Sequence, residues 1–212
     1  MLNSIIFLIV AFYNSTLTIK KQNHYYASFL IANGLTIGVF SALDAILFYV
    51  FFEALLIPMF LIIGIWGGPN RIYAAIKFFI YTFLGSVLLL ISFIYINSTI
   101  HSFNVNSFYD AHFSLAEQEW LFIAMAIAFA IKIPMFPFHT WLPDAHVEAP
   151  TSGSVILAAI LLKVGAYGFL RYVIPVVPMG ALSLDIYFII LSLIAIVYVG
   201  MIAIVQDDMK KL

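Results

Sequence analysis

The sequence predicts an all-α polytopic membrane protein, and three observations carry that prediction. The chain is 65% hydrophobic and 9% charged, with a mean hydropathy of +1.11, which is far from the composition of a soluble domain. Its apolar runs repeatedly reach the length of about 20 residues that a helix needs to cross the hydrocarbon core. Four prolines and several charged residues interrupt one such region between Lys132 and Lys163. Because proline breaks helical hydrogen bonding, the third observation predicts a discontinuous helix.

The composition also excludes several classes of function. A net charge of -1 without a basic tract argues against nucleic-acid binding. The chain has no cysteine, so it offers no disulfide, no thiolate metal site and no ligand for a cysteine-bound iron–sulfur cluster. Any redox cofactor that works with this chain is therefore expected on another polypeptide.

Seven spanning segments are expected along the chain. They cover residues 1–17, 25–43, 45–66, 71–96, 119–147, 152–174 and 184–205. The first is interpreted as the rear part of a spanning helix, because it lacks the basic n-region and cleavage site of a signal peptide. Asp44 marks the turn between the second and third segments, and Gly67-Gly68-Pro69-Asn70 marks the next turn. The segment 119–147 is expected to be the broken helix.

Basic residues near the connections predict the orientation. One side receives most of them, namely Lys20, Lys21, Arg71, Lys210 and Lys211, and the other side receives Arg171 alone. The positive-inside rule places the first group in the cytoplasm or in the mitochondrial matrix. The connection at 97–118 holds acidic residues and no basic residue, as an outer loop should.

Three ionisable residues stand inside apolar segments: Glu53, Lys132 and Lys163. Such residues are costly in the membrane and are functional candidates by default, so we interpret them as an in-plane row of proton-path residues. Opposite charges about 7 Å apart at an effective dielectric near 20 interact by about 2 kcal/mol, enough for Glu53 to influence whether Lys132 keeps its proton. Three alternatives remain: a protonated, hydrogen-bonded Glu53, a Lys132 that snorkels to the interface, and a Lys163 permanently paired with a carboxylate.

Nearby prolines and glycines support these interpretations. Pro134 forces the residue before it out of the α region, so the first half-helix should end at about Lys132. Pro58 cannot donate to the carbonyl one turn earlier, which leaves an acceptor free beside the glutamate. Gly165 and Gly168 are small residues that allow helices to approach closely in lipid.

A second group of ionisable residues lies nearer the predicted inner surface. Lys77 is interpreted either as a path residue or as an anchor that snorkels to that surface. His139 and His146 are candidate proton relays, because histidine titrates near neutrality. Metal binding by these histidines is the disfavoured alternative, so no metal is expected. Asp144, His146 and Glu148 either take part in function or decorate the inner rim.

These residues also carry a resemblance to a known family. The runs KIPMFPFHTWLPDAHVEAPTSGSVILAAILLKVGAYG, FYVFFEALLIPMFLIIGIWGG and KFFIYTFLGSVLLL resemble the antiporter-like subunit M (mitochondrial subunit 4) of NADH:quinone oxidoreductase, respiratory complex I. The lysine in the helix after the break makes this sequence more similar to subunit M than to its L or N relatives or to cation/proton antiporter subunits. The resemblance implies an antiporter-like fold of two inverted five-helix repeats, each with a broken helix. By position, it also implies proton-path roles for Glu53, Lys132 and Lys163.

The function implied by the resemblance is proton translocation coupled to quinone reduction elsewhere in the complex. NADH, FMN, iron–sulfur clusters and quinone would be bound by other subunits, and this chain would carry no redox centre. The implied partners are the other membrane-arm subunits, especially neighbouring antiporter-like subunits, and the lipid bilayer. The implied location is the bacterial inner membrane or the mitochondrial inner membrane.

The chain is less than half of the usual length in this family, so we expect a fragment or one part of a split gene. Residues 1–24 would be the rear part of a helix plus an inner loop, and 25–174 a complete first repeat. Residues 175–212 would be the first helix of a truncated second repeat. The alternatives in function are a sodium/proton antiporter subunit and a truncated, non-functional remnant.

Overall fold

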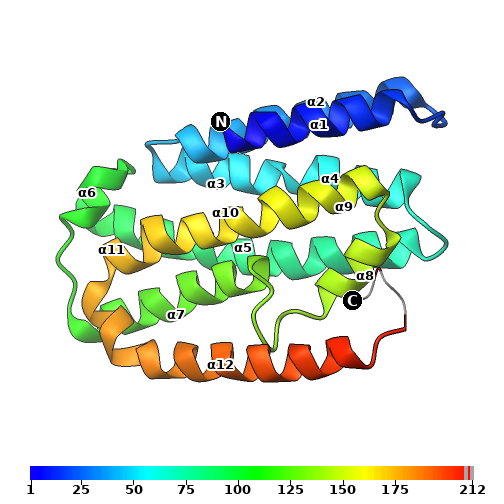
Figure 1. The fold of residues 1–212 in the computed structure, drawn as a ribbon. Helices are drawn as coiled ribbons and strands as arrows, with labels where there is room; N and C mark the ends of the chain where they lie inside the picture. The colour runs from blue at the N-terminus through cyan, green and yellow to red at the C-terminus, as the bar shows by residue number, and fades with distance from the viewer. Residues whose placement is uncertain (208–209, 211–212) are drawn as a thin grey trace.

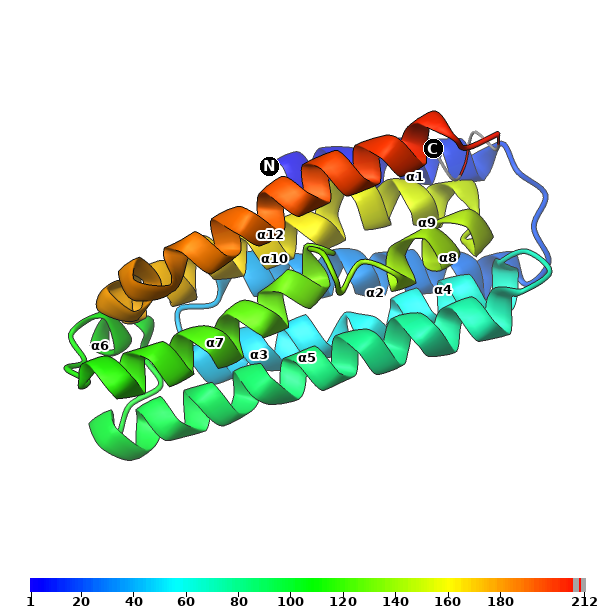
Figure 2. The same cartoon turned by 90° about the horizontal axis from the view of Figure 1, so that it is seen from below.

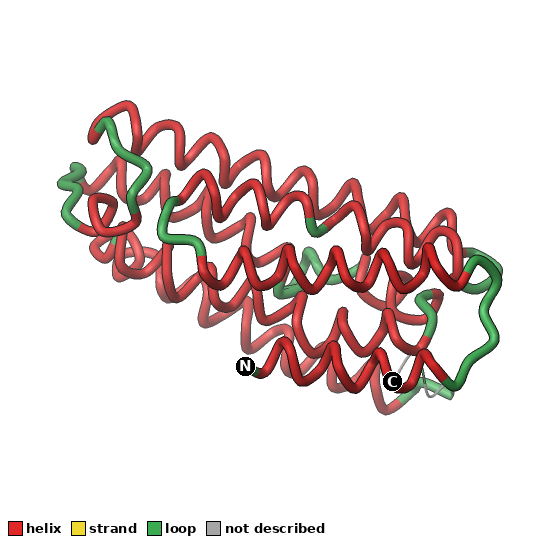
Figure 3. The backbone as a smooth tube through the Cα atoms, turned by 90° about the horizontal axis from the view of Figure 1, so that it is seen from above, coloured by secondary structure: helices red, strands yellow, loops and turns green. Residues whose placement is uncertain are grey.

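The computed structural model describes residues 1–207 and 210, and its long helices run side by side in an elongated bundle (Figure 1). Loops gather at the two ends of the bundle, and one further loop interrupts it part-way along (Figure 3). Lys211, expected on the inner side, lies outside the described residues, as does part of the segment 175–212. The all-α expectation is confirmed for the part of the chain that the structure describes, where the β structure is limited to one isolated bridge.

The helices divide the chain almost as the sequence predicts. In chain order they are α1 (Leu2–Ser15), α2 (Gln22–Ser41), α3 (Ala45–Ala54), α4 (Leu56–Trp66), α5 (Arg71–Ile100), α6 (Val105–Tyr109), α7 (Leu115–Lys132), α8 (Trp141–Glu148), α9 (Thr151–Ile156), α10 (Leu162–Gly168), α11 (Ile174–Val176) and α12 (Pro178–Ile204). Two π-helical segments, η1 (Leu157–Leu161) and η2 (Phe169–Val173), join α9, α10 and α11 into one span.

Among the described residues, four helical segments are long and apolar enough to cross a membrane. They are Ala45–Trp66, Arg71–Ile100, Thr151–Val176 and Pro178–Ile204. The shorter α1 is also apolar, and α2 and the broken pair α7 and α8 account for the two remaining predicted spans. The segment from Ala45 is interrupted at Leu55, three residues before Pro58, which cannot donate a hydrogen bond to the preceding turn.

The predicted outer loop at 97–118 is more ordered than expected, because its polar residues cap helices. Asn104 accepts a hydrogen bond from the amide of Asn106 and begins α6. Ser114 and Glu117 form a capping box that begins α7. Hydrogen bonds from Ser114 lower the pKa of Glu117, since they favour its charged form. The expected connection is thus reduced to short links between helices.

Both predicted turns are held by specific polar contacts. The Asp44 carboxylate accepts hydrogen bonds at 3.0 Å from two amides of the first turn of α3, which makes it the cap of that helix. At the other end of the bundle, the amide of Gly68 donates to the Glu148 carbonyl at 2.8 Å. A Cβ on Gly68 would lie 2.6 Å from the Glu148 carboxylate, so a larger residue there would displace that side chain. That carboxylate also accepts from the amide of Asn70 at 2.9 Å.

Two apolar clusters fill the bundle, and we name them for the sides that the positive-inside rule predicts. The outer cluster includes Phe48, Phe52, Phe93, Phe129 and Tyr172, and the inner cluster includes Tyr25, Leu55, Met59, Phe78 and Trp141. Phe52 of the outer cluster comes directly before Glu53, and Leu55 of the inner cluster comes two residues after it. The two clusters therefore meet at the level of this glutamate.

Helix α5 is the centre of the packing. It contacts α3, α4, α7 and α8, whereas α12 packs mainly against α7, and α1 packs against α2 and α9. Seen from below, α5 and α12 run along opposite sides of the α7 and α8 pair (Figure 2). The break lies between these two helices, where Lys132 is buried but Pro137 and Thr140 are exposed in this chain. Non-helical backbone at membrane depth has to be covered by protein or line a watery cavity.

Candidate functional site at the helix break

The helix break is closed by a buried tryptophan. Helix α7 ends at Lys132, as predicted, and α8 begins at Trp141. The Trp141 side chain is fully buried, and its indole Nε1 donates to the carbonyl of Ile131 at 2.9 Å. This carbonyl belongs to the last turn of α7, where no helical amide follows to bond it. Trp141 therefore ties the start of the second half-helix to the end of the first.

Lys132 is enclosed at the break. Its side chain is 1% exposed, and its Nζ has no hydrogen-bond partner among the described residues. The Nζ atom lies 4.7 Å from the ring centroid of Phe52 and 5.9 Å from that of Phe78. The snorkelling alternative is wrong for Lys132, because a snorkelling lysine would expose its amine at the interface.

Glu53 faces the same region from α3. Its Oε2 atom is buried and has no hydrogen-bond partner among the described residues. Ser86 of α5 lies beside this carboxyl group, and Lys132 interacts with it electrostatically. No ion pair joins Glu53 and Lys132 within the described part of the chain. The structure thus brings the two groups near each other without direct pairing.

Lys163 departs from the expected in-plane row. It is exposed, its Nζ donates to the carbonyl of Ala158, and it lines a hollow of about 510 Å³ with Tyr167 and Asn3. Gly165, two residues later, faces α7 instead: a Cβ there would lie 3.1 Å from the Cβ of Lys132. Residues two apart on a helix differ by about 200° in direction, so Lys163 points away from Glu53 and Lys132.

The predicted close approach at the glycines is confirmed. A Cβ on Gly165 would lie 2.9 Å from Cγ1 of Ile133, and a Cβ on Gly168 would overlap the ring of Phe129. These two positions lie on the same face of the span after the break. Glycine therefore sets the distance between this span and α7.

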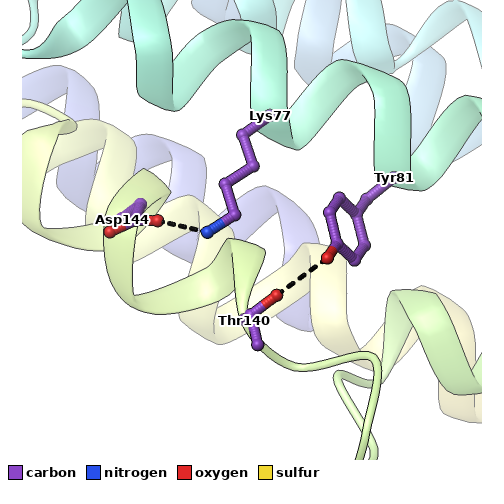
Figure 4. A network of polar contacts seen from close by, with 4 residues as sticks. All are labelled: Lys77, Tyr81, Thr140 and Asp144. Atoms are coloured by element: carbon purple, nitrogen blue, oxygen red, sulfur yellow. Dashed lines mark hydrogen bonds and ion pairs between the residues drawn. The ribbon is translucent and has the colours of Figure 1, made fainter.

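Lys77 forms an ion pair that the sequence did not reveal. Its Nζ lies 2.6 Å from the carboxylate of Asp144, with the two side chains 21% and 41% exposed. One turn further along α5, the Tyr81 hydroxyl accepts a hydrogen bond from Thr140 at 3.0 Å (Figure 4). Lys77 is thus paired within the described residues, and its role as a path residue or as an anchor stays a prediction. The two contacts attach the second half-helix to α5.

A cavity of about 640 Å³ opens beside this attachment. Its lining includes Asp144 and Glu148 of α8, Tyr73 of α5 and Ile202 of α12. Two acidic side chains therefore border a hollow at the predicted inner end, where Glu148 also holds the Gly68 turn. The rim interpretation of these residues agrees with this position.

The two histidines lie in different surroundings. The ring of His139 lies 5.8 Å from each of Phe136 and Tyr198, and its Nδ1 is buried without a partner among the described residues. His146 is half-buried, and its backbone carbonyl accepts from Ser154 at 3.0 Å. In the described residues, no three His, Cys, Asp or Glu side chains are grouped to hold a metal ion. The relay role of both histidines stays a prediction.

Sequence reasoning missed the aromatic residues of the site. Phe52, Phe78 and Trp141 surround the lysine and the break, yet each lies in a stretch already rich in aromatic residues. The adjacency of Phe52 and Glu53 was a local signal. It was a weak one, because 17% of the chain is aromatic.

These features define a multi-pass membrane protein whose broken helix encloses a lysine near an intramembrane glutamate. Lys132 ends α7 at the break and Glu53 lies on α3, and both helices contact α5. The chain belongs to the family described as NADH:quinone oxidoreductase/Mrp antiporter, TM, which matches residues 42–212.

Relatives from bacteria and organelles are similar over most of this chain. NADH-quinone oxidoreductase subunit M of Rickettsia bellii (strain RML369-C) is 54% identical over 207 residues, covering 96% of this chain and 42% of the relative. Subunit M of Rhodobacter capsulatus is 50% identical over 229 residues, covering 99% and 45%. NADH-ubiquinone oxidoreductase chain 4 of Chondrus crispus is 47% identical over 189 residues, covering 89% and 38%. The chain thus spans 38–45% of the length of these relatives.

Two solved structures share the fold. A chain of respiratory complex I from Thermus thermophilus with bound NADH aligns with a TM-score of 0.87 at 31% identity, over 100% of this chain and 44% of that one. A chain of the membrane-bound sulfane sulfur reductase, an archaeal respiratory membrane complex, aligns with a TM-score of 0.69 at 26% identity, over 81% and 28%. The antiporter-like helix bundle and the resemblance to subunit M are therefore confirmed. The chain is a multi-pass inner-membrane protein.

Proposed function

We propose that this chain supplies part of a proton-translocating membrane subunit of NADH:quinone oxidoreductase. Quinone reduction elsewhere in that complex would drive the translocation. One observation carries the proposal: Lys132 is buried at a helix break, has no hydrogen-bond partner among the described residues, and lies near Glu53. Burying an unpaired ammonium group is costly. Because the charged form of the lysine is disfavoured at this site, the site is suited to binding and releasing a proton.

In this proposal, the charge of Glu53 controls how tightly Lys132 holds its proton. A carboxylate that approaches the lysine favours its charged form, and a carboxylate that withdraws favours the neutral form. The titrations of two such groups are coupled, so the proton belongs to the pair. Lys163 points away from this pair and is kept as a separate candidate for the proton path, and Lys77, His139 and His146 are relay candidates on the inner side.

The proposed division of the chain follows the packing. Residues 25–174 form the first five-helix repeat in this proposal. Its support is that α3, α4, α7 and α8 contact α5, that α2 contacts α3 and α4, and that α10 and η2 contact α7. Residues 1–24 are the rear part of a preceding helix and an inner loop, and 175–212 begin the second repeat. The contact of α12 with α7 supports this arrangement, because it joins the proposed second repeat to the broken helix of the first.

The proposed partners and cofactors are those that the family resemblance implies. NADH, FMN, iron–sulfur clusters and quinone are assigned to other subunits of the complex, and the neighbouring membrane-arm subunits are the partners. The sodium/proton antiporter alternative is not favoured, because the relatives described above carry oxidoreductase names at 47–54% identity. The remnant alternative predicts absence from the assembled complex.

Substitution of the buried lysine tests the proposal. Lys132→Ala is introduced into the complete subunit, and the assembled complex is reconstituted into vesicles that contain a pH-sensitive dye. Proton translocation driven by NADH oxidation should be lost, because the methyl group cannot carry a proton. Lys20→Ala is the matched control, since Lys20 is exposed in the connection between α1 and α2.

The outcome separates the alternatives. Loss of translocation in Lys132→Ala, with normal assembly and an unaffected Lys20→Ala control, supports the proposal. Full translocation by an assembled Lys132→Ala complex would remove Lys132 from the path. A chain that does not co-purify with NADH dehydrogenase activity would favour the remnant.

A further inference from the structure

The surroundings of Lys132 raise a question that the proposed function leaves open. A buried ammonium group needs compensation for its lost water, yet the described residues offer its Nζ neither a hydrogen bond nor an ion pair. The charged groups on the neighbouring elements do not fill this role directly. Asp144 is paired with Lys77, and Glu53 interacts with Lys132 without forming an ion pair. Lys77 and Lys163 carry the same charge as Lys132 and cannot compensate it.

Two aromatic rings occupy the positions where a partner is needed. The Nζ of Lys132 lies 4.7 Å from the ring centroid of Phe52 on α3 and 5.9 Å from that of Phe78 on α5. Both distances fall within about 6 Å, the range in which a cation is attracted by an aromatic face. The two rings are 2% and 0% exposed, respectively. Without water to compete, this attraction is at its strongest.

Each ring is fixed by its own aromatic neighbours. The ring centroid of Phe52 lies 5.7 Å from that of Phe48 in a stacked arrangement and 6.1 Å from that of Phe129 in an edge arrangement. Phe78 contacts Trp141 at 5.4 Å, the residue whose indole closes the helix break. The rings therefore hold their positions while the long, flexible lysine moves. The position of the Phe78 ring also depends on Trp141, which closes the break.

We propose that Phe52 and Phe78 are positioning residues, forming an aromatic cradle that holds the protonated Lys132 side chain apart from Glu53. The inference rests on the proposed function and deepens it. The proton stays on Nζ while the side chain is in the cradle. When Nζ gives up its proton, the neutral amine loses its attraction to the ring faces and leaves. The lysine thus has two competing partners, a pair of rings and a carboxylate.

Graded fluorination of the rings tests the cradle. Phenylalanine at position 52 or 78 is replaced by its mono-, di- and trifluorinated forms in the complete subunit, within the assembled complex. Fluorine withdraws electrons from the ring face with little change in size, so packing is preserved while the attraction to a cation falls. The rate of NADH-driven proton translocation should fall stepwise, by about tenfold for three fluorines, as expected for a desolvated cation–π contact.

Two controls isolate the effect. Fluorination of Phe79 should change nothing, since Phe79 follows Phe78 on α5 but packs against Phe60 at 5.8 Å. Phe52→Tyr, which keeps the aromatic face, should retain most of the translocation, whereas Phe52→Leu, which removes the face, should not. A purely structural role would not produce a graded response to fluorine.

The results distinguish this inference from the function on which it rests. A stepwise loss at positions 52 and 78, with a flat response at 79, supports the cradle. If Lys132→Ala abolishes translocation while fluorination at 52 and 78 has no effect, the cradle is overturned and the proposed function stands. If Lys132→Ala leaves translocation intact, the proposed function is overturned, and the cradle with it.

Discussion

Replacing Trp141 with phenylalanine should open the helix break. The substitution keeps an aromatic ring against Phe78 but removes the indole N–H that donates to the Ile131 carbonyl at 2.9 Å. Leaving that buried acceptor without a partner costs about 1–3 kcal/mol. The smaller ring leaves a void, which adds about 1 kcal/mol. The total of about 2–4 kcal/mol raises the population with an open break by roughly 30-fold or more.

Hydrogen–deuterium exchange measures this population directly. Amides in residues 133–140 of the complete subunit, held in lipid nanodiscs, should exchange faster in Trp141→Phe by about that factor, because exchange reports local opening. Trp66→Phe is the matched control. Its indole also donates to a backbone carbonyl, that of Lys20 at 2.8 Å, but at an exposed position where water can replace it. We expect it to lose less than about 1 kcal/mol.

Equal exchange in the wild type and Trp141→Phe would refute the assignment of Trp141 as the closure of the break. Equal losses in the two tryptophan variants would refute the reasoning about burial. Faster exchange confined to residues 133–140 in Trp141→Phe would support both.

Two further predictions follow from the packing and the caps. Gly168→Ala should lower the free energy of unfolding by about 1–3 kcal/mol or more, because a Cβ there overlaps the buried ring of Phe129. Gly34→Ala is the control: nothing lies within 4 Å of a Cβ at that position, so helix propensity should make the change neutral or stabilising. Equal thermal shifts for the two variants would contradict this prediction. Because hydrogen bonds from Ser114 lower the pKa of Glu117, the charged carboxylate stabilises the start of α7 above its ordinary pKa, and that stability is lost as the pH falls through the lower folded value. The protection of amides 114–118, relative to an unstructured peptide at the same pH, should therefore fall between about pH 5 and about pH 3 in the wild type but not in Glu117→Gln, and a parallel fall in both would remove the role of the capping box.

Backbone chemistry made several features of this chain predictable. Helix α7 ends at Lys132 because Pro134 has no amide to donate to the Ala130 carbonyl, which accepts from Met135 instead. The expected change of backbone region before the proline is wrong, since Ile133 stays in the αR region. Asp44 caps α3, and both effects depend on residues within about one turn. The Gly68 turn follows from local sequence in the same way, and the long apolar spans follow from their length and hydropathy. The close approach at Gly168 was also foreseeable, since a missing side chain leaves room for a neighbouring helix.

Helix ends were less predictable where polar residues act as caps. The connection at 97–118 reads as a loop by hydropathy, yet Asn104 and Ser114 begin helices within it. The interruption of the third span at Leu55 and the π-helical turns around α10 also escaped prediction. Hydropathy measures the cost of leaving water, and it carries little information about local hydrogen bonding.

The sequence by itself determined the membrane spans, the broken helix, the family and the identity of the intramembrane charges. Only the tertiary structure decided which groups these charges meet. It turned Lys163 away from Glu53, paired Lys77 with Asp144, and placed Lys132 over the ring of Phe52. The reason is geometric: each residue turns a helix by about 100°, so the direction of a side chain depends on how whole helices rotate and pack. That rotation is set by contacts between residues far apart in the chain.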